Sequence, residues 1–331
     1  MEKKKRFYEI DVLRGGAIAI MILTHTNYFY LSNPRIHFTW NWLFFAVTMF
    51  VFSSAYIFFM AKKEIKLAEG VDFIYKRVKR LLIPYYLFLI PYFFIASIYE
   101  PNKLTSTYIT NNILVWGGLE TNWVVMLFLQ LSVIMPLILL LYQRHRLLFY
   151  LYAFASIVSS IIFLFYRPDF NYRWIMWLPW SIVILFAFYM ARSSRSFHHF
   201  VKTKLVLWVI FALTFGIVLF EQGSTIFFDH KYPPSLYYLS YGMAMVTLVF
   251  ILAEKNFFDW SPLKRLLTFL STYSYELFFV HYILINIRVV IFKEVQLSWI
   301  SFFIIIFIGS LLTMIMLNKI RSLLFVLKSS Q

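Results

Sequence analysis

The first long apolar stretch of the chain reads Phe7-Tyr-Glu-Ile-Asp-Val-Leu-Arg14-Gly-Gly-Ala-Ile-Ala-Ile-Met-Ile-Leu-Thr-His25. An α-helix turns about 100° per residue, so the eleven steps from Arg14 to His25 return to nearly the same face, about 16 Å further along the axis. The stretch therefore predicts a helix with a fixed cation near its start and an imidazole deep in an apolar layer. Ionisable groups at that depth are costly and usually face a cavity or a pathway. Both residues are therefore candidates for a functional site.

The composition predicts a membrane protein. Of 331 residues, 61% are hydrophobic and 14% are charged, and apolar runs of about twenty residues recur, the length that a helix needs to span a bilayer. Cysteine is absent, which excludes disulfides and thiolate metal sites. The basic leader Met1–Arg6 precedes an apolar run that is long and lacks a small-residue cleavage site, so we expect no cleaved signal peptide. We predict a multi-pass protein of the plasma membrane.

The fold expected is an all-α polytopic membrane protein, a single domain over residues 1–331 with about ten transmembrane helices and both termini in the cytoplasm. The predicted spans are 10–31, 40–61, 80–99, 122–142, 147–166, 174–191, 204–221, 236–253, 266–287 and 298–318. In this orientation 24 of the 31 Lys and Arg residues lie on the cytoplasmic side and 7 on the other, as the positive-inside rule requires. The net charge of +16 lies at the ends of apolar runs, so it does not indicate binding of nucleic acid.

A second charged feature is the pair Arg77 and Arg80, at the end of a predicted cytoplasmic loop that starts at Lys62. Three residues apart at the start of the span 80–99, the two arginines share one face of a helix. Guanidinium groups present planar donor forks that suit phosphate oxygens. Taken alone, the pair is also what an ordinary positive-inside anchor looks like.

A second run of polar residues, Ser271-Thr-Tyr-Ser-Tyr-Glu276-Leu-Phe-Phe-Val-His281-Tyr282, interrupts the apolar span 266–287. Counted from the starts of their spans, His25 and His281 each lie about 24 Å from the cytoplasmic face. We expect them at a similar depth, although either histidine could also be a satisfied polar link between helices. Glu276 lies shallower and needs a cation or a hydrogen-bond donor as its partner.

Further polar groups lie near these candidates. Asp11 is spaced to pair with Arg14 at i, i+3. The span 122–142 contributes Trp123 and Gln130, and the loop before it contributes Glu120.

These motifs, in this order, resemble the acyltransferase-3 family of integral membrane acyltransferases. The residues that carry the resemblance are Arg14-x10-His25, Arg77-x-x-Arg80 running into Leu-Leu-Ile-Pro84-Tyr85, Trp123 followed by Pro136, and Ser274-Tyr275-Glu-Leu-Phe-Phe-Val-His281. The likeness covers essentially the whole chain and is greatest to the acyltransferases of intercellular-adhesin and other exopolysaccharide clusters. The chain departs from the family at Ser54-Ala55, where Ser-Gly is usual, and at Trp123-Val124-Val125, where Trp-Phe-Leu is usual. These departures weaken inference about the substrate more than inference about the family.

The resemblance implies transfer of an acyl group, usually acetyl, from cytoplasmic acyl-coenzyme A to a hydroxyl of an extracytoplasmic polysaccharide or lipid-linked sugar. The family's functional positions fall on Arg14, His25, Arg77 and Arg80. In the mechanism that follows, Arg77 and Arg80 hold the phosphates of coenzyme A, Arg14 lines the mouth of the site, and His25 is the general base. Glu276 and His281 are further candidates for the site, either to orient His25 or to stabilise an oxyanion.

No metal is expected, because the seven histidines are scattered without ligand spacing. A polysaccharide exporter or flippase is the main alternative function, although the prolines show no two-fold pattern of broken helices. An N-acyltransferase that acts on an amino sugar fits the same residues. The sequence leaves open the acceptor, the choice between acetyl, succinyl and longer chains, and the oligomeric state.

Overall fold

A computed structural model describes residues 7–329 apart from 169, 194–196, 222 and 293–294. Its described elements are α-helices and 3₁₀-helices, and no β-strand occurs among them. The α-helices are α1 Tyr8–Asn27, α2 Pro34–Trp42, α3 Ala46–Ala61, α4 Leu67–Tyr99, α5 Ser106–Ile113, α6 Asn122–Arg144, α7 Arg146–Phe165, α8 Trp177–Arg192, α9 Phe197–Phe220, α10 Leu236–Glu254, α11 Ser261–Thr272, α12 Ser274–Val290 and α13 Trp299–Ser329. The 3₁₀-helices are η1 Tyr28–Tyr30, η2 Pro101–Lys103, η3 Tyr172–Trp174 and η4 Phe227–His230.

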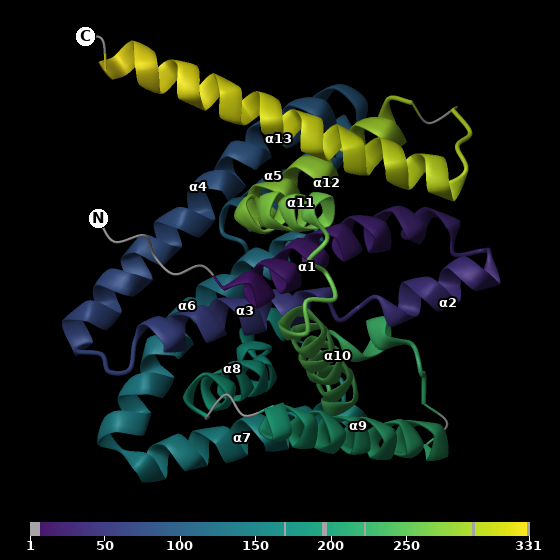
Figure 1. Cartoon of the computed structure of the whole chain (residues 1–331). Coiled ribbons are helices and arrows are strands. Elements are labelled where there is room, and N and C mark those ends of the chain that lie inside the picture. The colour runs from purple at the N-terminus through teal and green to yellow at the C-terminus, as the bar shows by residue number, and fades with distance from the viewer. Residues whose placement is uncertain (1–6, 169, 194–196, 222, 293–294, 330–331) are drawn as a thin grey trace.

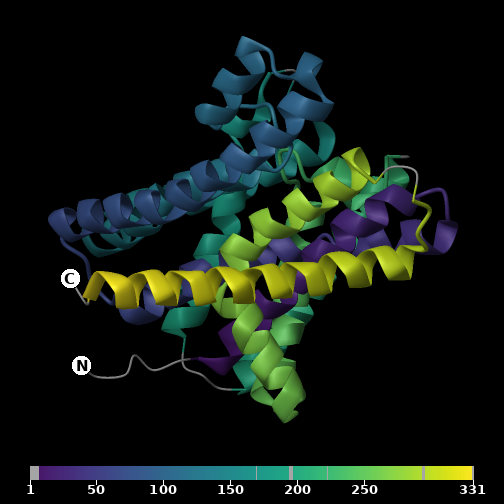
Figure 2. The same cartoon turned by 90° about the horizontal axis from the view of Figure 1, so that it is seen from above.

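The helices form a bundle whose long members cross it from end to end (Figures 1 and 2). Within the described residues, 7 helical segments are long and apolar enough to cross a membrane. This confirms an all-α polytopic membrane protein, and every predicted span contains a helix. The first turn of α1 and the last turn of α13 lie at the same end of the bundle in both views.

The predicted span 266–287 is not one continuous helix. It breaks at Tyr273 into α11 and α12, which meet at a residue with φ −108° and ψ 17°. Hydrogen bonds to α1 hold both sides of the break: Ser271 of α11 donates to Asp11 at 2.7 Å, and Arg14 donates to Ser274 of α12 at 3.1 Å. The polar run thus forms a joint between helices.

The prediction of a loop up to Arg80 is wrong, because α4 begins at Leu67 and runs for 33 residues. A Lys76–Asp72 ion pair of 2.7 Å at i, i+4 supports the added turns. Arg77 and Arg80 therefore lie within a long helix, where the backbone fixes the direction of both side chains.

Helix α1 lies at the centre of the bundle and contacts α3, α10, α11, α12 and α13. Gly15 allows its close approach to α11, since a Cβ there would collide with the carbonyl oxygen of Leu267. The outer helices differ: only 22% of the apolar window of α7, and the same share of that of α13, is buried, which leaves their remaining apolar surface for lipid. The central position of α1 places Arg14 and His25 inside the protein.

Candidate functional site

Two cavities open along α1, and each contains part of the predicted site. The first, which we call the arginine cavity, has a volume of about 400 Å³ and is lined by Arg14, Arg77, Arg80 and Glu276. The second, the histidine cavity, has a volume of about 290 Å³ and is lined by His25. The ten residues between Arg14 and His25 thus join two chambers along one helix.

The arginine cavity combines guanidinium groups from α1 and α4. Among the described residues, Arg77 and Arg80 make no ion pair and no side-chain hydrogen bond, and the Nε of Arg77 is buried without a partner. Arg14 donates to Ser274 at 3.1 Å. Glu276 is the one carboxylate among the residues that line this cavity, so the chamber carries a net positive charge. Its chemistry suits a polyanion.

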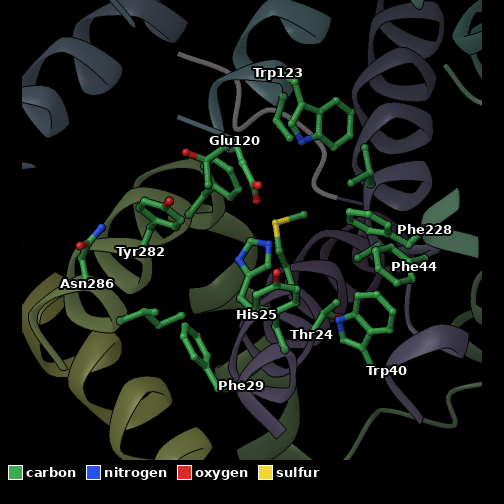
Figure 3. A pocket seen from close by; sticks show the side chains of 18 of the residues that line it. Thr24, His25, Phe29, Trp40, Phe44, Glu120, Trp123, Phe228, Tyr282 and Asn286 are labelled. Carbon is green, nitrogen blue, oxygen red and sulfur yellow. The ribbon is translucent and has the colours of Figure 1, made fainter. Parts of the chain in front are cut away.

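The histidine cavity is enclosed largely by aromatic rings (Figure 3). His25 lies near the middle of its wall, with Trp123, Phe44 and Phe228 on one side and Tyr282 and Asn286 on the other. The charged residues that line this cavity are Glu100, Lys103, Glu120 and Lys231. Apolar and aromatic walls with a few polar groups are typical of binding sites for small molecules.

His281 lies directly behind His25 and does not line the cavity. The Nδ1 atom of His25 is 2.8 Å from the Nε2 atom of His281, and the Nδ1 atom of His281 is 2.9 Å from the carbonyl oxygen of Leu277. A carbonyl oxygen only accepts, so His281 carries its proton on Nδ1 and, in its neutral form, accepts at Nε2. His25 must then donate from Nδ1, which leaves a lone pair on its Nε2 atom. The hydrogen-bond network therefore selects the tautomer of His25 that a general base needs.

The two cavities are separated by three apolar side chains, Met21, Val124 and Phe278, each of which lines both. They come from α1, α6 and α12. The two cavities therefore adjoin at these three side chains, which we call the partition.

Comparison with known families matches residues 7–319 to the acyltransferase domain family. The chain belongs to this family. It is a membrane acyltransferase, since the same residues form a bundle of apolar, membrane-spanning helices. Searches of curated proteins and of solved structures find no significant match.

The acyltransferase brings its predicted site residues into two groups. Arg14, Arg77, Arg80 and Glu276 surround the arginine cavity. His25 and His281 form an edge-to-edge, hydrogen-bonded pair at the other cavity, with ring centroids 5.1 Å apart and an interplanar angle of 19°. No group of three or more His, Cys, Asp or Glu residues that could hold a metal ion occurs among the described residues.

Some polar residues lie elsewhere than the sequence indicated, and others were missed. Gln130 lines neither cavity and instead donates to the carbonyl oxygen of Arg173 at 2.7 Å. Sequence reasoning assigned no role to Lys231, Tyr282 or Asn286, which line the histidine cavity of the acyltransferase. Tyr282 and Asn286 of α12 follow Phe278 by four and eight residues, so helical spacing places them on the same face. No local pattern in the sequence indicated Lys231.

Proposed function

We propose that this acyltransferase moves an acyl group, usually acetyl, from acyl-coenzyme A in the cytoplasm to a hydroxyl of a polysaccharide or lipid-linked sugar on the other side of the membrane. The observation that carries the proposal is the pair of adjoining chambers, one with the free guanidinium groups of Arg77 and Arg80 and one with a histidine lone pair, which share three lining side chains. Coenzyme A has the matching shape: a phosphorylated nucleotide and a slender arm that ends in the thioester.

The arginine cavity binds the acyl donor. Arg77 and Arg80 hold phosphate oxygens, and Arg14, fixed by Ser274, lines the path toward the partition. Charge-assisted bonds from guanidinium to phosphate are among the stronger contacts that a protein forms. The nucleotide stays in the arginine cavity, while the arm passes between Met21, Val124 and Phe278 and delivers the thioester to the histidine cavity.

Transfer takes place beside His25. The acceptor hydroxyl gives its proton to the Nε2 atom of His25 as its oxygen bonds to the thioester carbon. The tetrahedral intermediate then collapses, the carbon–sulfur bond breaks, and the departing thiolate takes the proton back from His25. The products are an ester and free coenzyme A, so no covalent enzyme intermediate and no further reactant are needed. His281 acts through His25 and is a positioning residue.

Sidedness tests the proposal. Proteoliposomes of uniform orientation would receive labelled acetyl-coenzyme A on the side of the arginine cavity alone. Oligosaccharides of glucose, glucosamine and N-acetylglucosamine would be enclosed on the other side. We expect labelled sugar esters on the acceptor side, identified by mass spectrometry, and free coenzyme A on the donor side.

Other outcomes favour other functions. Sugar that crosses the membrane without loss of donor would identify an exporter, and label on the amino nitrogen of glucosamine alone would identify an N-acyltransferase. Transfer that requires donor and acceptor on one side would contradict the threading of the arm.

A further inference from the structure

Lys231 is a buried cation in the wall of the histidine cavity. It follows η4 in the segment before α10, and only 8% of it is exposed. Its Nζ lies 4.6 Å from the ring centre of Trp123, 4.9 Å from that of Tyr232 and 5.0 Å from that of Phe44. Three ring faces at these distances hold an ammonium group in place by cation–π attraction.

The ammonium has no anionic partner in its cage. Among the described residues it makes no ion pair and no hydrogen bond, whereas Lys103, at the same cavity, pairs with Glu100 at 3.1 Å. A buried ammonium normally carries a high desolvation cost unless it is paired. Lys231 lines a chamber that also contains a candidate base, which indicates that the partner of the ammonium is supplied during the reaction.

We propose that Lys231 is a catalytic residue that stabilises the negative charge formed on the acyl carbonyl oxygen during transfer. This inference rests on the function proposed above. When the acceptor oxygen bonds to the carbonyl carbon, the electron pair of the C=O bond moves to the oxygen, and the acceptor proton moves to His25. The oxyanion then receives a hydrogen bond from the Lys231 ammonium until the carbon–sulfur bond breaks and the carbonyl reforms. Rigid donors at such a position act most strongly where water is excluded.

The burial of Lys231 also predicts a pH signature. Burial lowers the pKa of this ammonium to about 7, and the nearby Glu120 carboxylate raises it in part. The other titratable or charged groups around this cavity are His25, Tyr28, Tyr232, Tyr282 and the Glu100–Lys103 pair. The charged form is the active one, so activity should fall as the pH rises through about 7.

The test uses three variants of the purified full-length protein with acetyl-coenzyme A and the oligosaccharide mixture. Lys231→Met keeps the chain length and the ring contacts without the charge, and should lower kcat about 10²–10³-fold at an unchanged donor KM. Lys231→Arg keeps the charge at every pH tested, and should recover part of kcat and remove the fall in activity above pH 7. Lys264→Met is the matched control: Lys264 lies 4.8 Å from the ring centre of Tyr8 but lines neither cavity, so its kinetics should equal those of the wild type.

Each result decides between the two proposals. Wild-type protein that transfers no acetyl group contradicts the proposed function itself. Wild-type transfer with a Lys231→Met kcat within twofold of normal overturns the role of Lys231 alone. A fall above pH 7 that persists unchanged in Lys231→Arg also overturns it, and this measurement stands even if the methionine variant does not accumulate.

Discussion

The arginine cavity and the histidine cavity lie along the same helix but differ in how their polar side chains are held. In the arginine cavity the guanidinium groups of Arg77 and Arg80 are free, and Arg80 is exposed. In the histidine cavity the reactive ring is held by a chain of two hydrogen bonds and is surrounded by aromatic side chains. Free cations at an accessible mouth favour affinity for an anion, whereas a fixed and enclosed base favours chemistry. Variants of the first cavity should therefore change donor KM, and variants of the second should change kcat.

The largest effect is expected at His25. His25→Ala removes the base and should lower kcat by about 10²–10⁴-fold, the usual contribution of such a group, with donor KM unchanged. Kinetics of acetyl transfer by the purified variant measure both constants. His37→Ala is the control, because His37 contacts the ring of Trp40 and lines neither cavity. Loss of membrane abundance in the His25 variant, with normal kcat for the protein that remains, would make the histidine a structural link.

Next in size is the effect of Arg77 on donor affinity. Arg77→Gln should raise donor KM about ten- to hundredfold, since a hydrogen bond to a charged group contributes about 1.5–3 kcal/mol. Arg80→Gln should have a smaller effect because its side chain is exposed to water. Lys76→Gln is the control on the same helix, where Lys76 pairs with Asp72 outside the cavity. A donor KM that stays constant in the Arg77 and Arg80 variants would show that the two arginines only fix the orientation of the protein in the membrane.

Sequence predicted the parts of this site that depend on helical period and could not predict the parts that depend on packing. The Arg14–His25 and Arg77–Arg80 spacings place each pair on one face of a helix, whatever surrounds it. The division into two chambers depends on Met21, Val124 and Phe278 meeting from three helices, and nothing local marks them. The cage around Lys231 is likewise formed by rings far apart in the sequence.

The break at Tyr273 shows the same limit. Counting along one straight helix predicted that His25 and His281 lie at similar depth, and the structure brings them into contact, but by a different route. Tyr273 interrupts the helix, and Ser271 and Ser274, on either side of it, form hydrogen bonds with α1. Estimating depth from the number of residues after the start of a span assumes one straight helix. It could not predict the break at Tyr273, which sets the position of α12.

A smaller effect on kcat is expected at His281. His281→Leu should lower kcat about tenfold, because His25 loses the acceptor that fixes its tautomer and because one hydrogen bond contributes about 1 kcal/mol. His281→Gln places an amide oxygen near the former Nε2 position and should restore most of kcat. Donor KM should not change in either variant. Equal losses in the leucine and glutamine variants would show that His281 acts by packing alone.

The smallest effect, and the sharpest division between binding and folding, concerns the two serines beside Tyr273. Ser274→Ala removes the acceptor of Arg14 in the arginine cavity and should raise donor KM about threefold, within the range of one hydrogen bond at a partly exposed site. Ser271→Ala is its matched partner: Ser271 is buried, bonds to Asp11 and lines neither cavity. This second change removes one hydrogen bond to a buried carboxylate, so it should lower the free energy of unfolding in detergent by about 1.5–3 kcal/mol and leave donor KM unaltered. Kinetics and melting curves of both variants measure the two effects. A donor KM that responds equally to both substitutions would mean that the joint as a whole positions Arg14, and that Ser274 has no separate part in donor binding.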